Sequence, residues 1–474
     1  MDFSLNTISY SLAIFLFVLS AVYLYLKERK ERFKRDSAQN NLDFRGLQKL
    51  FIPPYLIVLL AESLQAPFLY VLYHSYRFIP SQIAALHVTG LISCLLISSI
   101  TNRLIHKYST RLLCLTCLST AAIACVFKFS DSFLLLFISR VLDGVSAGLV
   151  TTPFQEWYTE RHVGRMDFPP EWIENTFTKV ATGAAFGAVI AGWLSQTVEQ
   201  STGVIAMPFA LSALFMIIAG FIVGGRWDGG MKPSSTDPPA TLSFSKELAI
   251  LFRQPVALVL SVITIFTESA LQIFVFVWSP ILLKSKAIEG TNLGFGAAYA
   301  CLMAFSLIGA LLFHSPISKR IPTSRMLAIA LFCSVFTLYF SFANLPETSL
   351  SWKHANFTKL LLAFCLFEAT VGVLSPALGS LKAELTPTMS RGSIIGVPVT
   401  VISSLCILFL HPLGDAQQSL IGTALGLLIM AAFLGILLDL VLASRGREAP
   451  RPLSVSAPRP ISSLPSVHHS PSQG

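Results

Sequence analysis

Three acidic side chains, Glu62, Glu268 and Glu368, each lie near the middle of a long apolar segment of the chain. A carboxylate there costs about 2.5 to 3.5 kcal/mol if the segment spans a lipid bilayer, so it normally faces a cavity or a partner. We therefore predict that the three carboxyl groups bind a ligand or a proton. The alternative is that each carboxyl is protonated and only forms a hydrogen bond to a neighbouring helix.

The stretch around Glu62, "AESLQAPFLY", contains further polar groups of interest. Glu62 and Gln65 are three residues apart, so they lie on the same face of a helix. Pro67 has no amide hydrogen and leaves the carbonyl group of Ser63 without its helical partner. A helix interrupted by proline beside a carboxylate is a common binding-site element in membrane proteins.

Arg140 is the best candidate for binding an anion within the apolar segments. Its planar guanidinium can donate two parallel hydrogen bonds to an oxyanion. Asp143, one helical turn later, is its expected partner, and the alternative is that the two residues only neutralise each other. Glu156 and Lys179 lie at corresponding ends of two successive segments. We predict that they form a gating or structural pair rather than a ligand site.

Membrane-spanning helices must position these residues. Of the 474 residues, 53% are hydrophobic and 12% are charged, and the mean hydropathy of +0.67 lies outside the usual range of soluble domains. A helix needs about 20 mainly apolar residues to span the bilayer. Thirteen segments meet this condition, beginning near residues 6, 51, 81, 111, 132, 174, 203, 255, 295, 326, 358, 392 and 419. We therefore predict an all-α polytopic membrane protein.

Lysine and arginine residues predict the orientation of these segments. The loops on one side hold 26 basic residues and those on the other side hold 6. Because basic short loops tend to stay in the cytoplasm, we expect the richer side to be cytoplasmic. Residues 1–26 are then a retained transmembrane anchor with its N-terminus outside, and residues 27–50 are a basic cytoplasmic loop. The net charge of +9 follows from this topology and needs no nucleic-acid partner, and the lipid bilayer is the expected surroundings.

Other features agree with this orientation. Residues 444–474 are rich in proline and serine and are predicted to form a disordered cytoplasmic tail. Asn356 in "NFT" lies in a predicted outer loop and is a candidate for glycosylation. All eight cysteines lie in the predicted segments, so neither disulfides nor a metal site is expected.

The two halves of the chain resemble each other. "LLAESLQAPFLYVLYHS" resembles "IFTESALQIFVFVWSP", which pairs Glu62 with Glu268 at an offset of 206 residues. "STRLLCLTCLS" resembles "TSRMLAIALFCS", which pairs Arg111 with Arg325 at an offset of 214 residues. Similar offsets at two places indicate a duplicated six-helix unit.

We therefore expect two pseudo-symmetric halves of six transmembrane helices, preceded by one extra N-terminal helix. The N-terminal half is assigned to residues 51–225 and the C-terminal half to residues 255–443. The longer cytoplasmic stretch at 226–254 is the expected linker.

This arrangement resembles the major facilitator superfamily, and several stretches resemble its molybdate-anion transporter family more closely. These are "LQAPFLYVLY", "SRVLDGVSAGLV", "FQEWYTERHV" followed by "DFPPEWI", and "FTESALQIFVFVWSPIL". The resemblance extends from the N-terminal helix to about residue 443. In the loop "TNRLIHKYSTR", Asn102 stands where the superfamily usually has an aspartate.

The resemblance implies a carrier in the cell membrane that imports molybdate, or a similar oxyanion, by alternating access. Three carboxylates would repel a doubly negative anion, and this conflict is removed if burial favours their protonated forms. A neutral carboxyl then donates a hydrogen bond to the oxyanion. Our hypothesis is proton-coupled import, in which protons and molybdate bind together outside and leave inside.

Two alternatives remain open from the residues. The acidic segments also fit a proton-coupled carrier of an organic solute. A membrane sensor or scaffold with a carrier fold that transports nothing is the alternative from another class. An enzyme is not expected, because the sequence contains neither an H-E-x-x-H nor a Walker A pattern. Neither a cofactor nor a nucleotide is therefore expected.

Overall fold

The computed structural model describes residues 14–23, 41–229, 251–289, 294–315, 318–345, 357–385, 393–410 and 416–448. All regular structure in these ranges is helical. Asn356, most of the expected linker and the tail beyond Glu448 lie outside the described residues.

The N-terminal helices are α3 (Leu42–Gln65), α4 (Leu69–Ser75), α5 (Pro80–Lys107), α6 (Thr110–Phe127), α7 (Phe133–Leu149), α8 (Thr152–Thr159), the π-helical turn η1 (Glu160–Arg165), α9 (Trp172–Thr202) and α10 (Met207–Arg226). The C-terminal helices are α12 (Pro255–Glu289), α13 (Phe295–Phe313), the short 3-10 helix η2 (Ser318–Arg320), α14 (Thr323–Ala343), α15 (Phe357–Leu385), α16 (Ser393–Leu410) and α17 (Ala416–Glu448).

Eleven helical segments of the described chain are long and apolar enough to cross a membrane. Two shorter apolar helices, Ile14–Tyr23 and Ile394–Leu410, fall at the remaining two predicted positions. The prediction of an all-helical, multi-pass membrane protein is therefore confirmed. The last helix, α17, continues to Glu448, five residues beyond the predicted end of its half.

Helix α3 begins at Leu42 rather than at the predicted residue 51. The side chain of Asn41 caps it by accepting hydrogen bonds from the amides of Asp43 and Phe44 at 2.9 and 3.0 Å. Its first turns bury Phe44 and Leu47 on one face and expose polar residues on the other. This amphipathic start has low hydropathy, which explains why the apolar pattern misses it.

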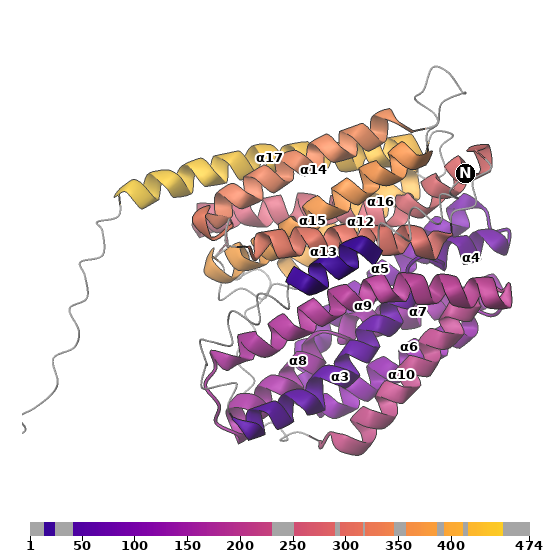
Figure 1. Cartoon of the computed structure of the whole chain (residues 1–474), viewed down its shortest axis with the longest axis horizontal. Helices are drawn as coiled ribbons and strands as arrows, with labels where there is room; N and C mark the ends of the chain where they lie inside the picture. Colours follow the sequence, from indigo (N-terminus) through magenta and orange to yellow (C-terminus); the bar gives the residue numbers. More distant parts are fainter. Residues whose placement is uncertain are drawn as a thin grey trace, which may run out of the picture.

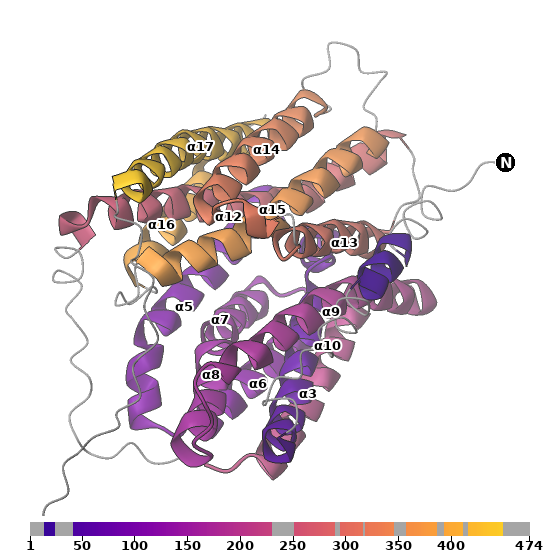
Figure 2. The ribbon, with the colours of Figure 1, turned by 60° about the vertical axis from the view of Figure 1, so that its left-hand side comes forward.

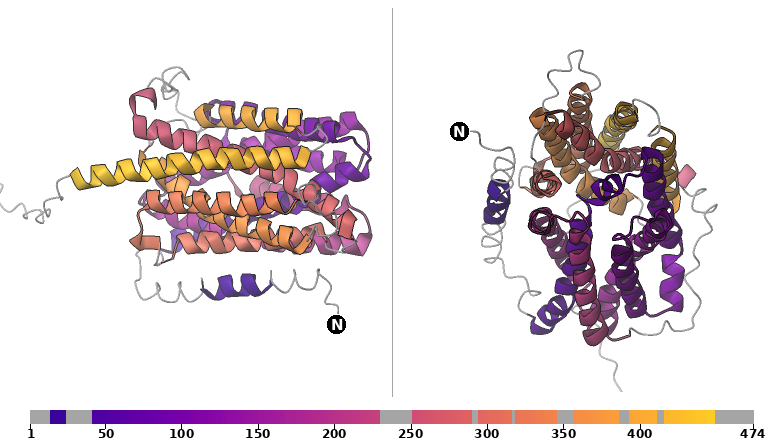
Figure 3. Two further views of the ribbon diagram at one scale, coloured as in Figure 1. Left: turned by 90° about the horizontal axis from the view of Figure 1, so that it is seen from above. Right: turned by 90° about the vertical axis from the view of Figure 1, so that its right-hand side faces the viewer.

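The helices form two groups that follow the order of the chain (Figure 1). Helices α3 to α10 pack mainly against one another, and helices α12 to α17 do the same. An end-on view separates the groups clearly, with the N-terminal helices below and the C-terminal helices above (Figure 3). Contacts between the groups run chiefly through the pairs α9–α13, α5–α16 and α4–α12.

Two glycines allow a close approach between the groups. A Cβ atom on Gly192 of α9 would lie 2.7 Å from both the amide nitrogen of Ala300 and the carbonyl oxygen of Gly296 on α13. The amide of Gly296 also donates a hydrogen bond of 2.9 Å to the side chain of Gln196. Small residues therefore let the two helix backbones touch, as in other membrane helix pairs.

The internal repeat predicted from the sequence is visible in equivalent contacts. Arg111 of α6 donates a hydrogen bond to the carbonyl oxygen of Gly224 on α10. Its counterpart Arg325, on α14, lies 3.4 Å from the carboxylate of Asp439 on α17. Each arginine thus joins the third and sixth helices of its own group.

The outer surface of the bundle is apolar. Large side chains such as Phe221, which is 78% exposed, lie along many helices, as expected for a lipid-facing surface. The short helix Ile14–Tyr23 lies on this surface beside α9 and α13 (Figure 2). Its Phe17 packs against Phe186 and Trp193 of α9, with ring centroids 5.0 and 5.5 Å apart.

Candidate functional site

The first transmembrane helix is interrupted where the sequence predicts. Helix α3 ends at Gln65 and α4 begins at Leu69, with Pro67 in the turn between them. The break places the side chain of Gln65 against two other helices. Its amide nitrogen donates to the hydroxyl of Ser212 on α10 at 2.9 Å, and that hydroxyl donates to the carbonyl oxygen of Ala61 at 2.7 Å.

Gln65 belongs to a buried cluster of charges at the end of α6. The ammonium group of Lys128 donates to Gln65 Oε1 at 2.7 Å and to the carboxylate of Asp143 at 2.8 Å. Arg140 Nη1 lies 2.9 Å from the same carboxylate, so the predicted Arg140–Asp143 contact is present. The Lys128 side chain is fully buried. Two cationic side chains therefore share one carboxylate.

The guanidinium of Arg140 crosses α5 at Gly90. Arg140 Nε donates to the carbonyl oxygen of Leu86 at 3.3 Å, and Nη1 is used by Asp143. A Cβ atom on Gly90 would lie 2.9 Å from the guanidinium carbon, closer than real Cβ contacts allow. The absence of a side chain at Gly90 thus makes room for the guanidinium between α5 and α7.

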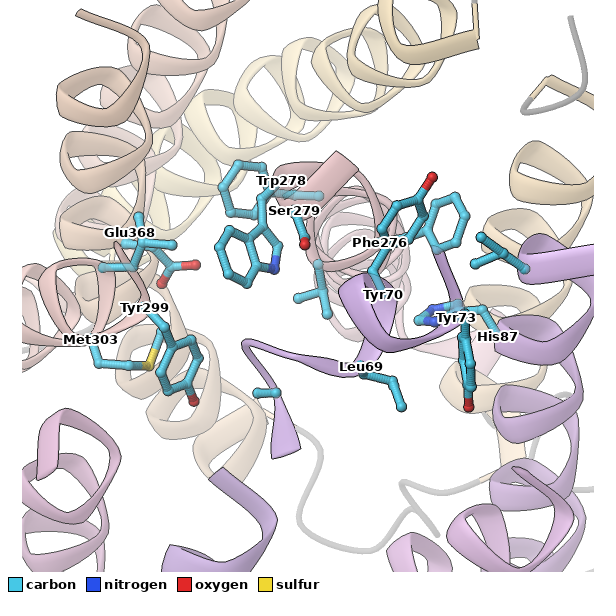
Figure 4. Close-up of a pocket in the computed structure, with 15 residues that line it drawn as sticks. Leu69, Tyr70, Tyr73, His87, Phe276, Trp278, Ser279, Tyr299, Met303 and Glu368 are labelled. Carbon is cyan, nitrogen blue, oxygen red and sulfur yellow. The ribbon is translucent and has the colours of Figure 1, made fainter. Parts of the chain in front are cut away.

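A pocket of 340 Å³ lies between the two helix groups, close to this cluster (Figure 4). The N-terminal group contributes Tyr70, Tyr73 and His87, and Tyr73 interacts electrostatically with Arg140. The wall from the C-terminal group has four aromatic residues among nine, and it holds the following residues: Phe274, Val275, Phe276, Trp278, Ser279, Tyr299, Leu302, Met303 and Glu368. The rings of His87 and Phe276 meet across the groups with centroids 4.9 Å apart.

Glu368 is the only acidic side chain among the residues that line this pocket. It is 8% exposed, and Figure 4 shows its carboxyl group pointing toward Tyr299 and Trp278. The hydroxyl group of Ser279, on the same wall, is buried and has no hydrogen-bond partner within the described protein. The pocket therefore offers an unused hydroxyl and a carboxyl to a ligand.

The other two predicted carboxylates lie on equivalent helices in different surroundings. Glu62 is half-buried on α3 and interacts electrostatically with Asp143. Glu268, on α12, accepts a hydrogen bond of 2.7 Å from Lys382 of α15. Its side chain is 39% exposed and that of Lys382 is 17% exposed. Only Glu368 of the three thus lines the pocket, and Glu62 lies near the charge cluster.

Of the two predicted gating residues, Glu156 lies in the middle of α8 and Lys179 lies about two turns into α9. Glu156 and Lys179 are both exposed. Lys179 donates a hydrogen bond of 2.8 Å to Gln48 Oε1 on α3, a contact that the sequence does not predict. A role of Glu156 and Lys179 as a gate pair stays a prediction.

Lys128, in the charge cluster, and Lys382, the partner of Glu268, are not among the site residues that the sequence predicts. Each follows the apolar part of its helix, where a lysine normally lies in a loop or at the interface. Their partners Gln65, Asp143 and Glu268 are distant in sequence, so spacing gives no signal for the contacts.

The sequence also contains one G-x-S-x-G string, "GVSAG", which is the nucleophile motif of many serine hydrolases. It lies inside α7, whereas the nucleophile of hydrolases with this motif sits on a turn between a strand and a helix. Gly144 packs instead against α5, where its Cβ would lie 2.6 Å from the carbonyl oxygen of Gly90. The string is therefore a helix-packing feature.

Similarity to known proteins identifies the fold and the family of this chain. A family model described as sugar transporters with 12 transmembrane helices matches residues 10–367. The solved structure of the peptide transporter PepTSo has a TM-score of 0.64 at 11% identity, covering 84% of this chain and 98% of that one. The nucleoside transporter NupG has a TM-score of 0.59 at 14% identity, covering 84% and 99%.

Curated relatives are closer in sequence. The molybdate-anion transporter of Takifugu rubripes is 32% identical over 421 residues, which cover 82% of this chain and 85% of that protein. The molybdate-anion transporter of Danio rerio is 31% identical over 416 residues, covering 82% and 84%. Matches of this length and identity establish common descent over most of the chain. The chain therefore belongs to the molybdate-anion transporter family of the major facilitator superfamily.

Proposed function

We propose that this chain is a secondary transporter that imports molybdate across the cell membrane by alternating access. The relatives named as molybdate-anion transporters support the substrate. The observation that carries the proposal is the shared carboxylate: Lys128 and Arg140 both contact Asp143, which leaves one positive charge of the cluster uncompensated. An uncompensated cation beside a pocket favours an anionic ligand.

Arg140 is the side chain proposed to bind the oxyanion. Two of its nitrogens are held by Leu86 and Asp143, so the guanidinium plane is fixed before the ligand arrives. Charge-assisted hydrogen bonds from such a fixed group to an oxyanion are among the stronger ones in proteins. Lys128, which is buried and holds Asp143 and Gln65, acts as the positioning residue.

Proton coupling is proposed through the carboxyl groups. Glu368 lines the pocket, and Glu62 lies beside the charge cluster. If both are protonated when molybdate binds, neither repels the anion and each donates a hydrogen bond. Release of the protons on the cytoplasmic side then restores the repulsion and expels the anion.

Alternating access requires the two halves to move, and we take residues 51–225 and 255–443 as these halves, with 226–254 as the linker. The α9–α13 contact at Gly192 and Gly296 lies in the halves of these helices that the loop charges assign to the outside. So does the α4–α12 contact, in which the rings of Tyr70 and Phe276 have centroids 6.2 Å apart. We propose that these contacts close the pocket from the outside in the present structure. The N-terminus is proposed to lie outside and the C-terminus in the cytoplasm.

The test is molybdate uptake by purified protein in proteoliposomes. Wild-type protein is expected to accumulate molybdate saturably, and Arg140→Gln is expected to weaken its apparent affinity about 30-fold, corresponding to about 2 kcal/mol. Arg103→Gln, which removes an exposed charge at the far end of α5, is the matched control and should keep the wild-type affinity. Equal uptake by the wild type and by Arg140→Gln would show that Arg140 does not bind molybdate.

The aromatic wall of the pocket favours a second candidate, a proton-coupled carrier of an organic solute. Rings such as Tyr70, Trp278 and Tyr299 offer flat apolar surfaces that a bare oxyanion does not use. Competition separates the two functions. If molybdate fails to accumulate in the proteoliposomes and a panel of sugars or nucleosides is taken up, the organic solute is the substrate.

A further inference from the structure

A second concave surface, which the transport site does not use, lies between the predicted cytoplasmic ends of α3 and α9. It is a groove of 570 Å³. Its lining includes three basic residues, three apolar residues and no acidic residue: Arg45, Lys49 and Lys179, with Leu42, Ile52 and Pro53. None of these residues lines the pocket between the two helix groups.

The three cations are gathered from two helices. Arg45 and Lys49 are four residues apart on α3, so they lie on one face, and both are exposed. Lys179 comes from the second turn of α9, and its ammonium group is held by Gln48 at 2.8 Å. The position of three positive charges on one groove is thus fixed by the packing of α3 against α9.

Gln48 holds Lys179 because it is itself fixed. Its side chain is 6% exposed and donates a hydrogen bond of 2.8 Å to Thr176. Thr176 shares a hydrogen bond with Tyr158 of α8, which contacts His162 at 3.2 Å. The groove is therefore connected by buried polar contacts to the segment between α8 and α9.

Basic and apolar side chains share one face of α3 in this groove. Ile52 and Pro53 lie further along the helix, toward the predicted membrane interior, than Arg45 and Lys49, and this order indicates the class of ligand. Clustered lysines and arginines at the cytoplasmic face of a membrane protein attract phosphorylated lipid headgroups. The apolar residues cannot contribute to binding a free inorganic anion, whereas they can pack against the first carbons of an acyl chain. Ile52 is half-buried and Pro53 is exposed, which leaves apolar surface for such a contact.

We propose that this groove binds an anionic phospholipid whose headgroup carries phosphomonoester groups, as in a phosphoinositide. The phosphates contact Arg45, Lys49 and Lys179, and the acyl chain lies along Ile52 and Pro53. Because α9 also packs against α13 of the other half, an occupied groove stabilises the cytoplasmic end of a helix that must move during transport. The site is independent of which substrate the pocket takes.

Binding is tested on the full-length protein in detergent, without any transport assay. The probe is a short-chain phosphatidylinositol bisphosphate, with short-chain phosphatidylcholine and free inositol trisphosphate as the comparison ligands, and affinity is measured from the shift in Tm and by native mass spectrometry. The variant is Arg45→Gln with Lys49→Gln. The matched control is Arg103→Gln with Lys107→Gln, which removes two exposed charges from the same predicted face outside the groove.

The wild type and the control are expected to bind the phosphoinositide and not phosphatidylcholine. The groove variant is expected to bind it about 30-fold more weakly, corresponding to about 2 kcal/mol for two charges near an anionic headgroup. Equal affinity of the groove variant and the wild type overturns the proposal. If the wild type binds free inositol trisphosphate as tightly as it binds the lipid, the acyl chain contributes nothing to binding, and the proposal of a lipid ligand is overturned. Displacement of the lipid by molybdate assigns the groove to the transport path and also overturns the proposal.

Discussion

The ammonium group of Lys128 lies 2.8 Å from the carboxylate of Asp143, inside the N-terminal group of helices. Arg140 contacts the same carboxylate from within α7. An arginine and an aspartate alone would form a neutral pair with no charge left for a ligand. The buried Lys128 adds a second positive charge beside the single carboxylate of Asp143, so the cluster attracts an anion.

Removing Lys128 should destabilise the protein. Lys128→Met leaves Gln65 Oε1 without its donor and removes one of the two partners of Asp143. Loss of one partner of a buried ion pair costs about 3 to 5 kcal/mol, and we expect about 3 because Arg140 remains. The measurement is chemical unfolding in detergent.

The double variant Lys128→Met with Asp143→Asn provides the control for this effect. Asp143→Asn also takes the carboxylate away from Arg140, so the double variant should be less stable than the wild type, but its loss should be smaller than the sum of the losses in the two single variants. A loss in the double variant that equals the sum of the losses in the two single variants would show that the Lys128–Asp143 contact contributes nothing to stability.

Gly90→Ala should weaken transport with little loss of stability. The new Cβ would lie 2.9 Å from the guanidinium carbon of Arg140, so the guanidinium must shift. A misplaced binding group can reduce activity about 10- to 100-fold. Gly220→Ala, where no atom lies within 4 Å of the new Cβ, is the control. Molybdate uptake by the two variants is compared, and equal rates would mean that the position of Arg140 does not matter.

The pair Glu268–Lys382 offers a test that separates a proton carrier from a structural link. Each of Glu268→Gln and Lys382→Gln breaks the contact of 2.7 Å. Because Glu268 is 39% exposed, water screens the pair and we expect a stability loss of about 1 kcal/mol or less in both variants. Because Glu62 and Glu368 are the proposed proton carriers, neither variant should reduce the stimulation of uptake by a proton gradient. A reduction in Glu268→Gln alone would show that Glu268 also carries a proton, and the same reduction in both variants would show that the contact between the two residues is required.

The approach of α9 to α13 should be sensitive to a single methyl group. In Gly192→Ala, the new Cβ would lie 2.7 Å from backbone atoms of Ala300 and Gly296, which cannot move as a flexible side chain can. We expect a loss of about 1 to 3 kcal/mol, typical of overpacking. On the same helix, the Cβ of Gly187→Ala would lie 3.9 Å from Leu60, an ordinary contact. Thermal unfolding of the two variants should therefore differ, and equal Tm values would argue against the tight contact.

The sequence predicts the parts of the site that depend on local spacing. The break at Pro67 and the contact between Arg140 and Asp143 follow from the covalent structure of proline and from the helical repeat. The internal repeat is readable because duplicated helices keep similar apolar patterns around Glu62 and Glu268.

Contacts between distant segments are not contained in such patterns. Lys128 follows an apolar stretch and has the signature of a loop residue, yet tertiary packing buries it completely beside Gln65 and Asp143. Likewise, the pocket is formed by side chains of two helix groups, and no local pattern shows that Tyr73 and Trp278 line one cavity. These relationships depend on how the two groups pack.

We propose that molybdate enters together with protons through the site beside Glu62. The measurement that tests this most directly is molybdate accumulation in proteoliposomes that contain wild-type or Glu62→Gln protein, with and without an inward proton gradient. We expect that the gradient stimulates uptake by the wild type and that Glu62→Gln loses this stimulation while it still binds molybdate. Uptake by the wild type that does not respond to the gradient would contradict proton coupling, and folded protein without any accumulation would contradict molybdate transport itself.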